Sequence, residues 1–399
     1  MNPLNEYDNR VRIVLDDGYE IVDPAETTHD QASNPDLAMF SDSSSSYDTM
    51  NTIHSDEVAS YFRSVHGSLF PSDENAPPII PTGVTADRLD LLLHIIIRLS
   101  RRGKNVPDVV DKMLRDGGID EGGSGARVLD VVTNSGAWVN ETAEIYPTVT
   151  FTSIDFKPLV PHVPHPRIDF QVYNFQAGIM KPDNTFDLVH VRQGVLATNQ
   201  FNFLLRELHR VLKPNGYIVI TEFPFEVDSR STRTSLGNDP PTPLRTSHYY
   251  AQIVKLGLET CKAESVDIAA WQDMSARLEP SHSLWQDQPT KEQDILDSNK
   301  ASVNTQSLRG FYGISMHQEP IPLGAWHPDE YRKTLGTLLQ SYTFQNVCSS
   351  LPVITERVRS GMGESQPHKF MEKLLEELRD IANYQAFAML HTWLARKLA

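Results

Sequence analysis

The middle of this chain alternates between two hydrophobic patterns. From residue 126, short apolar runs of strand length are separated by segments whose apolar residues recur every three to four positions, as on one helix face. Strands that alternate with helices favour a mainly parallel sheet with right-handed crossovers. Ligands in such sheets bind beyond the carboxyl ends of the strands. The pattern predicts strands at 126–132, 149–156, 167–175, 186–192 and 217–223, and helices at 136–146 and 201–213.

The flanking segments are less regular. Residues 85–102 carry apolar residues at the spacing of a docked helix, and the glycine-rich stretch 116–125 is typical of a linker. The second helix of the central region should stop at Pro214-Asn215-Gly216, because proline cannot continue a helix and Asn-Gly favours a turn. Towards the C-terminus we expect loops at 226–247 and 286–307, helices at 248–264, 328–345 and 367–397, and a strand at 311–326.

Composition adds a division within the chain. The 399 residues are 39% hydrophobic, enough for one large core or two modest ones. The net charge is −16, but residues 1–57 alone hold thirteen acidic and two basic residues. This segment is too polar to bury its share of apolar surface, so we expect a disordered acidic tail. The rest of the chain has no basic surplus to neutralise phosphates, which argues against nucleic acid as a partner.

Several classes of protein are disfavoured by what the sequence lacks. No run approaches the ~18 to 20 apolar residues of a bilayer span, so no membrane partner is expected. The first twenty residues lack the basic-then-apolar order of a secretory signal, which favours a cytoplasmic protein, with the nucleus as the alternative. Cys261 and Cys348 cannot form a disulfide framework or a metal cluster, so we predict no metal.

The candidate chemistry lies in VLDVVTNSGAW at 128–138, a strand that ends in an acid and a polar loop with one glycine. In a strand-loop-helix unit, glycines let the backbone approach a cofactor, and the first helical amides present donors. Asp155 ends the next strand about twenty residues later, where a carboxylate accepts hydrogen bonds from ribose hydroxyls. No Ser-His-Asp order, phosphate loop or metal-ligand spacing offers a rival motif.

From Arg127 to Glu222 the chain resembles the class I S-adenosylmethionine-dependent methyltransferases, specifically the large fungal group of regulators and tailoring enzymes of secondary metabolism. The stretches YFRSVHG, DRLDLLLH, EPIPLGAW and HTWLARK look like flanking patterns of that group, so the resemblance covers roughly residues 58 to 399. It implies an α/β, Rossmann-like sheet of seven strands, six parallel and one antiparallel, with helices on both faces and an α-helical cap. The implied cofactor is S-adenosylmethionine.

The resemblance also implies roles for residues around the cofactor. The family usually has glycine where Val132 and Asn134 stand, and an acid where Asn174 stands. Asparagine tolerates left-handed backbone, whereas a β-branched residue resists it. In an active enzyme we therefore expect Val132 to avoid positive φ and to turn its side chain away from the cofactor. The expected contacts are Asp130, Val132, Asn134 and Gly136 around the methionine part, Asp155 at the ribose, and Asn174 and Phe175 flanking the adenine.

No catalytic residue can be assigned from the sequence. His190 and Arg192 lie towards the end of the fourth strand, near where a methyl group would move, but pairing with nearby acids explains them equally well. Glu222 has the same ambiguity at the end of the fifth strand. A sulfonium methyl is already activated, so the protein chiefly aligns donor and acceptor and excludes water. A carboxylate or acidic enol acceptor would need no strong base.

The expected activity is methyl transfer to an oxygen of a small secondary metabolite. Two alternatives remain: a catalytically dead protein whose sheet survives as a binding module, and a regulator of secondary metabolism that binds a protein partner. The predicted organisation is a disordered acidic tail (1–57), an N-terminal helical cap and linker (58–125), a cofactor-binding core (126–225), a substrate-cap insertion (226–310), and C-terminal strands and helices that complete the sheet (311–399).

Overall fold

The chain divides into two units, Met1–Thr52 and Ile53–Ala399. All residues that the computed structural model describes belong to the second unit: 57–119, 125–159, 164–224, 227–228, 249–286, 309–361 and 366–399. The predicted acidic tail, apart from its last residue, lies outside the described residues, as do most residues of the two predicted polar loops after residue 225. Their predicted disorder stays a prediction.

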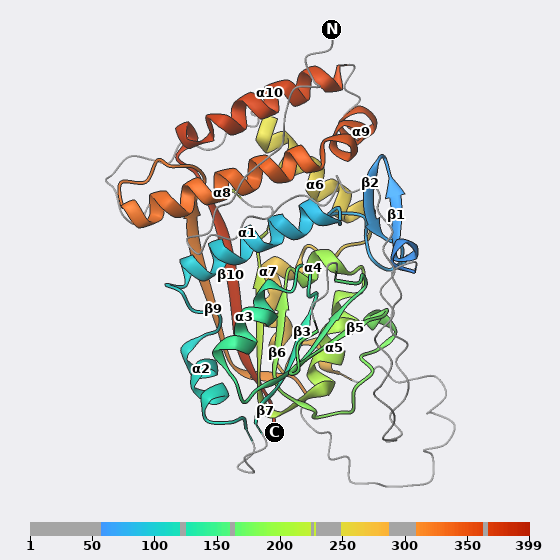
Figure 1. Cartoon of the computed structure of the whole chain (residues 1–399), viewed down its shortest axis with the longest axis vertical. Coiled ribbons are helices and arrows are strands. Elements are labelled where there is room, and N and C mark those ends of the chain that lie inside the picture. Colours follow the sequence, from blue (N-terminus) through green and yellow to red (C-terminus); the bar gives the residue numbers. More distant parts are fainter. Residues whose placement is uncertain are drawn as a thin grey trace, which may run out of the picture. The chain divides into compact units, whose positions relative to one another are not determined.

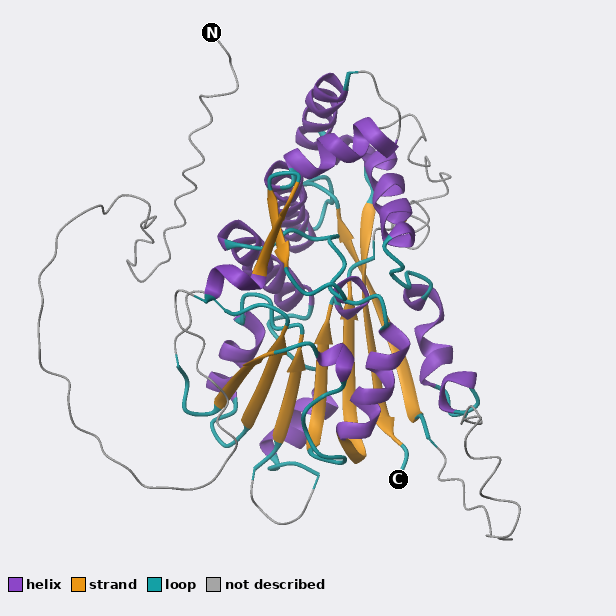
Figure 2. Ribbon diagram, turned by 90° about the vertical axis from the view of Figure 1, so that its right-hand side faces the viewer, coloured by secondary structure: helices purple, strands orange, loops and turns teal. Residues whose placement is uncertain are grey.

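One mixed sheet forms the centre of the described unit (Figure 2). β5, β4, β3, β6 and β7 are parallel neighbours in that order, and β10 pairs antiparallel with both β7 and β9. Six long strands therefore run one way and β10 runs the other, which confirms the predicted sheet; a two-residue strand, β8, also pairs with β10. The bounds are β3 Arg127–Val131, β4 Thr150–Asp155, β5 Ile168–Val172, β6 Phe186–Arg192, β7 Leu212–Glu222, β8 Val227–Asp228, β9 Phe311–Pro322 and β10 Phe387–Lys397.

The five central strands fall within a few residues of the predicted ones. β6 is buried along its whole length, as expected of a parallel strand that is covered on both faces. β7 starts earlier than predicted. The register of its pairing with β6 shifts between Phe186–Leu212 and Leu188–Tyr217. The expected Pro-Asn-Gly turn therefore lies within the strand as an irregularity, where Asn215 has a φ of 64°.

The predicted helix across residues 367–397 is wrong in its second half. A helix runs only over Pro367–Arg379, and Phe387–Lys397 forms β10. This strand is sandwiched between β7 and β9, so nearly all its side chains are buried, on both faces. A strand that is apolar on both faces lacks the period of two, and periodicity alone cannot distinguish it from a buried helix.

Helices cover both faces and one end of the sheet. α2 and α3 pack on one face and α5 and α7 on the other, whereas α1, α6, α8, α9 and α10 gather at the end above the strands (Figure 1). Leu89, Leu93 and Ile96 of α1 are buried, at the spacing that predicted this helix. The bounds are α1 Val84–Ser100, α2 Asp108–Arg115, α3 Ala137–Ile145, α4 Gly194–Ala197, α5 Phe201–Val211, α6 Tyr249–Ala263, α7 Ala270–Leu278, α8 Glu330–Ser349, α9 Leu351–Gly361 and α10 Pro367–Arg379.

A small antiparallel hairpin precedes α1. Its strands β1 (Phe62–Val65) and β2 (Ser68–Pro71) pair only with each other and not with the main sheet. The hairpin and the loop that follows it lie beside α6 and α9 (Figure 1). Segments from both ends of the described unit therefore meet above the carboxyl ends of the parallel strands.

Candidate functional site

A cavity of about 560 Å³ opens beyond the carboxyl ends of β3 and β4. Its walls come from the loops after these strands, the hairpin and the loop that follows it, and helices α1, α6, α8 and α9. The volume falls within the range of about 300 to 1,000 Å³ that is usual for small-molecule sites. The position is also the one that open α/β sheets use for ligands. We call the part beside β3 and β4 the cofactor end, and the part between α6, α8 and α9 the acceptor end.

The loop after β3 has a left-handed backbone at three positions: Val132 (φ 64°), Asn134 (φ 52°) and Gly136 (φ 74°). Gly136 precedes α3, and a Cβ atom there would lie 3.0 Å from the Asn140 side chain and 3.1 Å from that of Leu159, so this left-handed position favours glycine. Asn134 adopts the conformation that asparagine tolerates, as predicted. The expectation that Val132 avoids positive φ is wrong.

Val132 is held in this conformation by its surroundings. Its amide donates to the Ile154 carbonyl at 3.0 Å, and the residue is only 8% exposed, within the apolar core. The same side chain lines the cavity. A left-handed conformation costs an L-residue about 1 to 2 kcal/mol, so this loop stores strain where a cofactor is expected.

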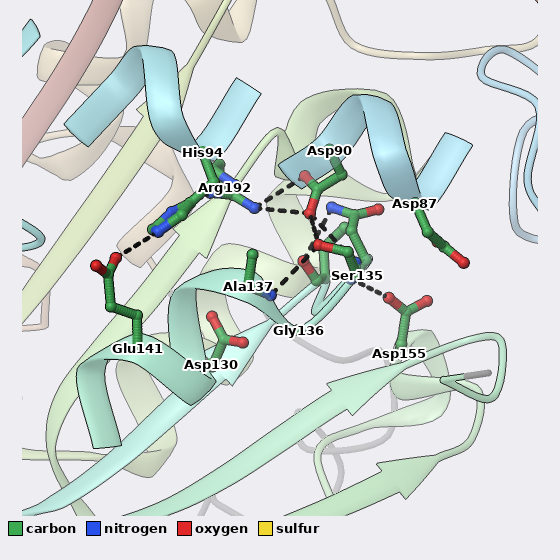
Figure 3. Close-up of polar contacts among 12 residues, drawn as sticks. Asp87, Asp90, His94, Asp130, Ser135, Gly136, Ala137, Glu141, Asp155 and Arg192 are labelled. Carbon is green, nitrogen blue, oxygen red and sulfur yellow. Dashed lines mark hydrogen bonds and ion pairs between the residues drawn. The ribbon is translucent and has the colours of Figure 1, made fainter. Parts of the chain in front are cut away.

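Asp155 organises the same loop from the end of β4. Its Oδ2 accepts a hydrogen bond from the Asn134 amide at 2.8 Å (Figure 3), and its Oδ1 accepts one from the Lys157 amide at 3.3 Å. Burial raises the pKa of Asp155, against the opposing charge of Lys157. Each carboxylate oxygen has two lone pairs, so Asp155 retains acceptor capacity for a ligand hydroxyl.

Lys157 is a cofactor-end residue that sequence reasoning missed. Its ammonium group lies 3.2 Å from Asp87 Oδ1 and donates to the Asn134 carbonyl at 3.3 Å, and the side chain is buried. Burial lowers the pKa of Lys157, but the charges of Asp155 and Asp87 outweigh it and the net pKa is raised. The sequence feature that could have identified it is a lysine two residues after the acid that ends a strand, in SIDFKP.

Asp90 joins α1 to the loop through a second charged network. Its Oδ2 accepts hydrogen bonds from the Ser135 hydroxyl at 2.5 Å and the Ser135 amide at 3.2 Å. Arg192 donates to both Asp90 oxygens, at 2.8 and 3.0 Å, and contacts His94, which pairs with Glu141 at 2.6 Å (Figure 3). Arg192 is thus in a buried ion pair and does not line the cavity.

Asp130 and His190 form a buried pair under the same loop. His190 Nδ1 lies 2.8 Å from Asp130 Oδ1, and the imidazole stacks on Trp138 with ring centroids 3.6 Å apart. Burial lowers the pKa of His190 to about 4, although Asp130 opposes the shift. His190 is therefore neutral at neutral pH, and its Nδ1–H donates to the carboxylate. Neither residue lines the cavity.

The two residues predicted to flank the adenine lie just behind the cavity wall. The Asn174 side chain accepts from the Gln176 amide at 2.9 Å and caps a 3₁₀ turn. Phe175 is fully buried, and its ring centroid lies 4.1 Å from that of Phe156, which lines the cavity. Of the predicted cofactor residues, Val132, Asn134 and Asp155 line the cavity directly. The cofactor-binding roles of all the predicted residues stay predictions.

The acceptor end has a different character. α6 contributes mostly apolar side chains, while α8 and α9 add Asn346, Ser350 and Arg357. Sequence reasoning placed none of these residues in a site. No group of His, Cys, Asp or Glu within the described ranges is arranged to hold a metal ion. No helix in the described part of the chain is long and apolar enough to span a bilayer.

The charges of the cofactor end suit a cationic ligand. Asp87 and Asp155 face a single ammonium, that of Lys157, and the Asp90–Arg192 pair is neutral as a whole. The cofactor end therefore carries one excess negative charge. S-adenosylmethionine carries one net positive charge, from its sulfonium and ammonium groups and its carboxylate. The residues present fit this cofactor in charge and in the acceptor that Asp155 offers a ribose.

Comparison with known proteins supports the same cofactor. A family model described as a methyltransferase domain matches residues 98–253. The regulator of secondary metabolism laeA from Emericella nidulans, also described as a protein-methionine methyltransferase, is 22% identical over 278 residues, covering 68% of this chain and 62% of its own length. The match thus spans less than two thirds of that relative. Methyltransferase str2 from Strobilurus tenacellus is 23% identical over 100 residues, covering 25% of this chain and 36% of its own.

Solved structures give a weaker likeness. A putative sarcosine dimethylglycine methyltransferase from Galdieria sulphuraria aligns with a TM-score of 0.33 and 12% identity, over 77% of this chain and 86% of its own. The family model and the relatives confirm the predicted family and cofactor, S-adenosylmethionine. The chain is thus similar to the class I S-adenosylmethionine-dependent methyltransferases, and among them to the laeA regulators of secondary metabolism.

Proposed function

We propose that this chain transfers a methyl group from S-adenosylmethionine to an oxygen of a small secondary metabolite. The observation that carries the proposal is the continuity of the cavity. The same space that meets Asp155 and Asn134 at the carboxyl ends of the strands extends between α6, α8 and α9. One cavity thus has room for a donor and an acceptor side by side, as direct transfer requires.

Each part of the cofactor end has a role in this reaction. When bound, S-adenosylmethionine supplies a methyl group that is already activated on a sulfonium. Asp155 accepts hydrogen bonds from the ribose, and its bond to the Asn134 amide fixes the loop. Asp90 and Arg192 hold α1 against that loop, so the cavity keeps its shape.

The lining residues argue for an acidic acceptor. The carboxylates among them are Asp87, Asp90 and Asp155, and each is engaged by a cation or by loop amides. None is therefore a free general base in the described cavity. An acceptor that is already ionised, such as a carboxylate or an acidic enol, needs no base to attack an activated methyl group.

Calorimetry tests the proposal first. Titration of the full chain with S-adenosylmethionine and S-adenosylhomocysteine should show binding at micromolar to millimolar concentration. Radiolabelled S-adenosylmethionine mixed with a panel of carboxylic and enolic metabolites should then yield a labelled small molecule. Absence of cofactor binding at millimolar concentration would refute the proposal.

A binding module or regulator is the second candidate. The left-handed valine in the cofactor loop favours it, because this strained β-branched residue occupies cavity wall where the family usually has glycine. The laeA relatives, which are described as regulators, point the same way. Under this alternative a partner pull-down recovers a specific protein, and that protein instead of a metabolite carries any transferred label.

A further inference from the structure

The acceptor end contains one cation that the proposed reaction does not use. Arg357 lies on α9 and lines the cavity; Lys157, at the other end, is the remaining cation in the lining that the described residues form. The side chain is partly buried among the residues around it. Figure 1 shows α9 beyond α1, on the side away from the sheet. Arg357 and the cofactor loop therefore reach the cavity from different directions.

Arg357 has few protein partners. Its Nη2 donates to the Pro78 carbonyl at 2.5 Å, and among the described residues no carboxylate pairs with it. Burial lowers the pKa of Arg357, and the exposed Glu264 acts on it only as a more distant charge. A guanidinium has five N–H donors in a rigid fork that matches a carboxylate. A partly desolvated cation of this kind is stabilised by an anion that enters the cavity.

The surroundings of Arg357 define the rest of such a ligand. α6 presents Ile253, Val254 and Leu256 to the same cavity, which favours an apolar body. Asn346 and Ser350, one helical turn apart, add polar atoms from the end of α8. An apolar molecule with a carboxylate at one end matches this combination, whereas a cationic amine would meet a guanidinium that no carboxylate of the described residues neutralises.

We propose that Arg357 anchors the acceptor through a carboxylate, so that the substrates of this chain are apolar carboxylic acids. The inference rests on the proposed methyl transfer and adds the substrate class. The anchored carboxylate is not the methylated group. A carboxylate held by a guanidinium fork is a weaker nucleophile, and the methyl donor lies at the other end of the cavity. The oxygen that reacts, on an acidic enol or a second carboxylate, belongs to the opposite end of the acceptor.

Matched probes test this assignment on the full chain. 4-Phenylbutyrate and the neutral 4-phenylbutanamide have the same apolar body and differ in charge. Both are titrated by calorimetry, with and without saturating S-adenosylhomocysteine. We expect the wild-type chain to bind the acid about 10- to 100-fold more tightly than the amide, the range for hydrogen bonds to a charged group. Arg357→Met should abolish this preference and leave amide binding within about twofold.

The control is Arg359→Met on the same helix. Arg359 is exposed, pairs with Glu356 and does not line the cavity, so its loss should leave the acid preference unchanged. Arg357→Lys, which keeps the charge but loses the fork, should retain part of the preference and covers the case in which Arg357→Met does not fold. Equal binding of acid and amide by the wild type, or an unchanged preference in Arg357→Met, would overturn the assignment.

The two proposals fail in different ways. If S-adenosylhomocysteine binds but the wild type does not prefer the acid, the carboxylate anchor is wrong and methyl transfer stands. If the acid preference depends on Arg357 while neither cofactor form binds, the anion site stands and the proposed reaction is wrong.

Discussion

The two ends of the cavity are built on different principles. At the cofactor end, charged side chains satisfy one another: Asp90 with Arg192, and Lys157 with Asp87. At the acceptor end, helices α6, α8 and α9 surround a mainly apolar space in which Arg357 donates to the Pro78 carbonyl and pairs with no carboxylate of the described residues. The first end is fixed in shape before a ligand arrives, whereas the second leaves an interaction for the ligand to complete. A change at one end should therefore have little effect at the other.

Of the changes predicted here, Asp90→Ala should have the largest effect, and it disrupts the charged network of the cofactor end. It leaves Arg192 buried without its carboxylate and removes the acceptor of the Ser135 amide. Breaking one partner of a buried ion pair costs about 3 to 5 kcal/mol, measured here as the free energy of unfolding in urea. Asp108→Ala, which breaks an exposed pair with Lys104, is the control and should change stability little. An equally small change for Asp90→Ala would show that its network is solvated.

A buried acid outside both ends gives a pH test. Burial raises the pKa of Glu222 to about 7 from 4.5, although Trp271 and the Val195 amide donate to it. The folded chain thus holds a proton that the unfolded chain releases, so this group's contribution to stability is complete below pH 4.5 and declines as pH rises to 7. The decline amounts to about 3 kcal/mol.

Glu222→Gln removes the titration. The unfolding free energy of the wild type minus that of the variant should therefore fall by about 3 kcal/mol from pH 4.5 to 7, because only the wild type loses stability. Cofactor and acid affinities should follow the wild type, since Glu222 does not line the cavity. A difference that stays constant with pH would mean that Glu222 is ionised in the fold.

Asp155→Ala sharpens the comparison at the cofactor end. Loss of its hydrogen bonds to the ribose should weaken S-adenosylmethionine binding by about 1 to 3 kcal/mol in calorimetry. Asp155→Asn keeps one side-chain acceptor and should lose less. The 4-phenylbutyrate affinity of both variants should match the wild type. If S-adenosylmethionine affinity does not change, the cofactor does not contact this strand end.

The smallest effect is expected for Val132→Gly. Glycine relieves about 1 to 2 kcal/mol of left-handed strain but loses the burial of the valine side chain, so stability should change little. S-adenosylmethionine affinity should be similar or a few-fold tighter. Binding that appears only in Val132→Gly, alone or with Asn134→Gly, would identify the natural chain as a binding module that has lost its cofactor.

The contrast between the ends also explains what the sequence could predict. The strands and loops of the cofactor end are each continuous in the sequence. Local sequence patterns therefore predicted its strands, Asp155 at a strand end and the left-handed backbone of Asn134. Asp90 and His94 gave a weaker signal, as polar residues beside the apolar face of α1. Arg357 gave none, because only the tertiary fold brings α9 to the cavity. The last strand was mistaken for helix because β7 and β9 bury both its edges and the helices both its faces.

The position of β10 also bears on how the chain folds during synthesis. The five parallel strands lie within residues 127–222, but the free edge of β7 finds its partner only when residues 387–397 have been made. Until then, the backbone groups along that edge are exposed to other chains, which is a route to aggregation. Closing the sheet also requires contacts between segments far apart in the sequence, which slows folding. Chaperone dependence in the cell should therefore be greatest for nascent chains that end between these two strands.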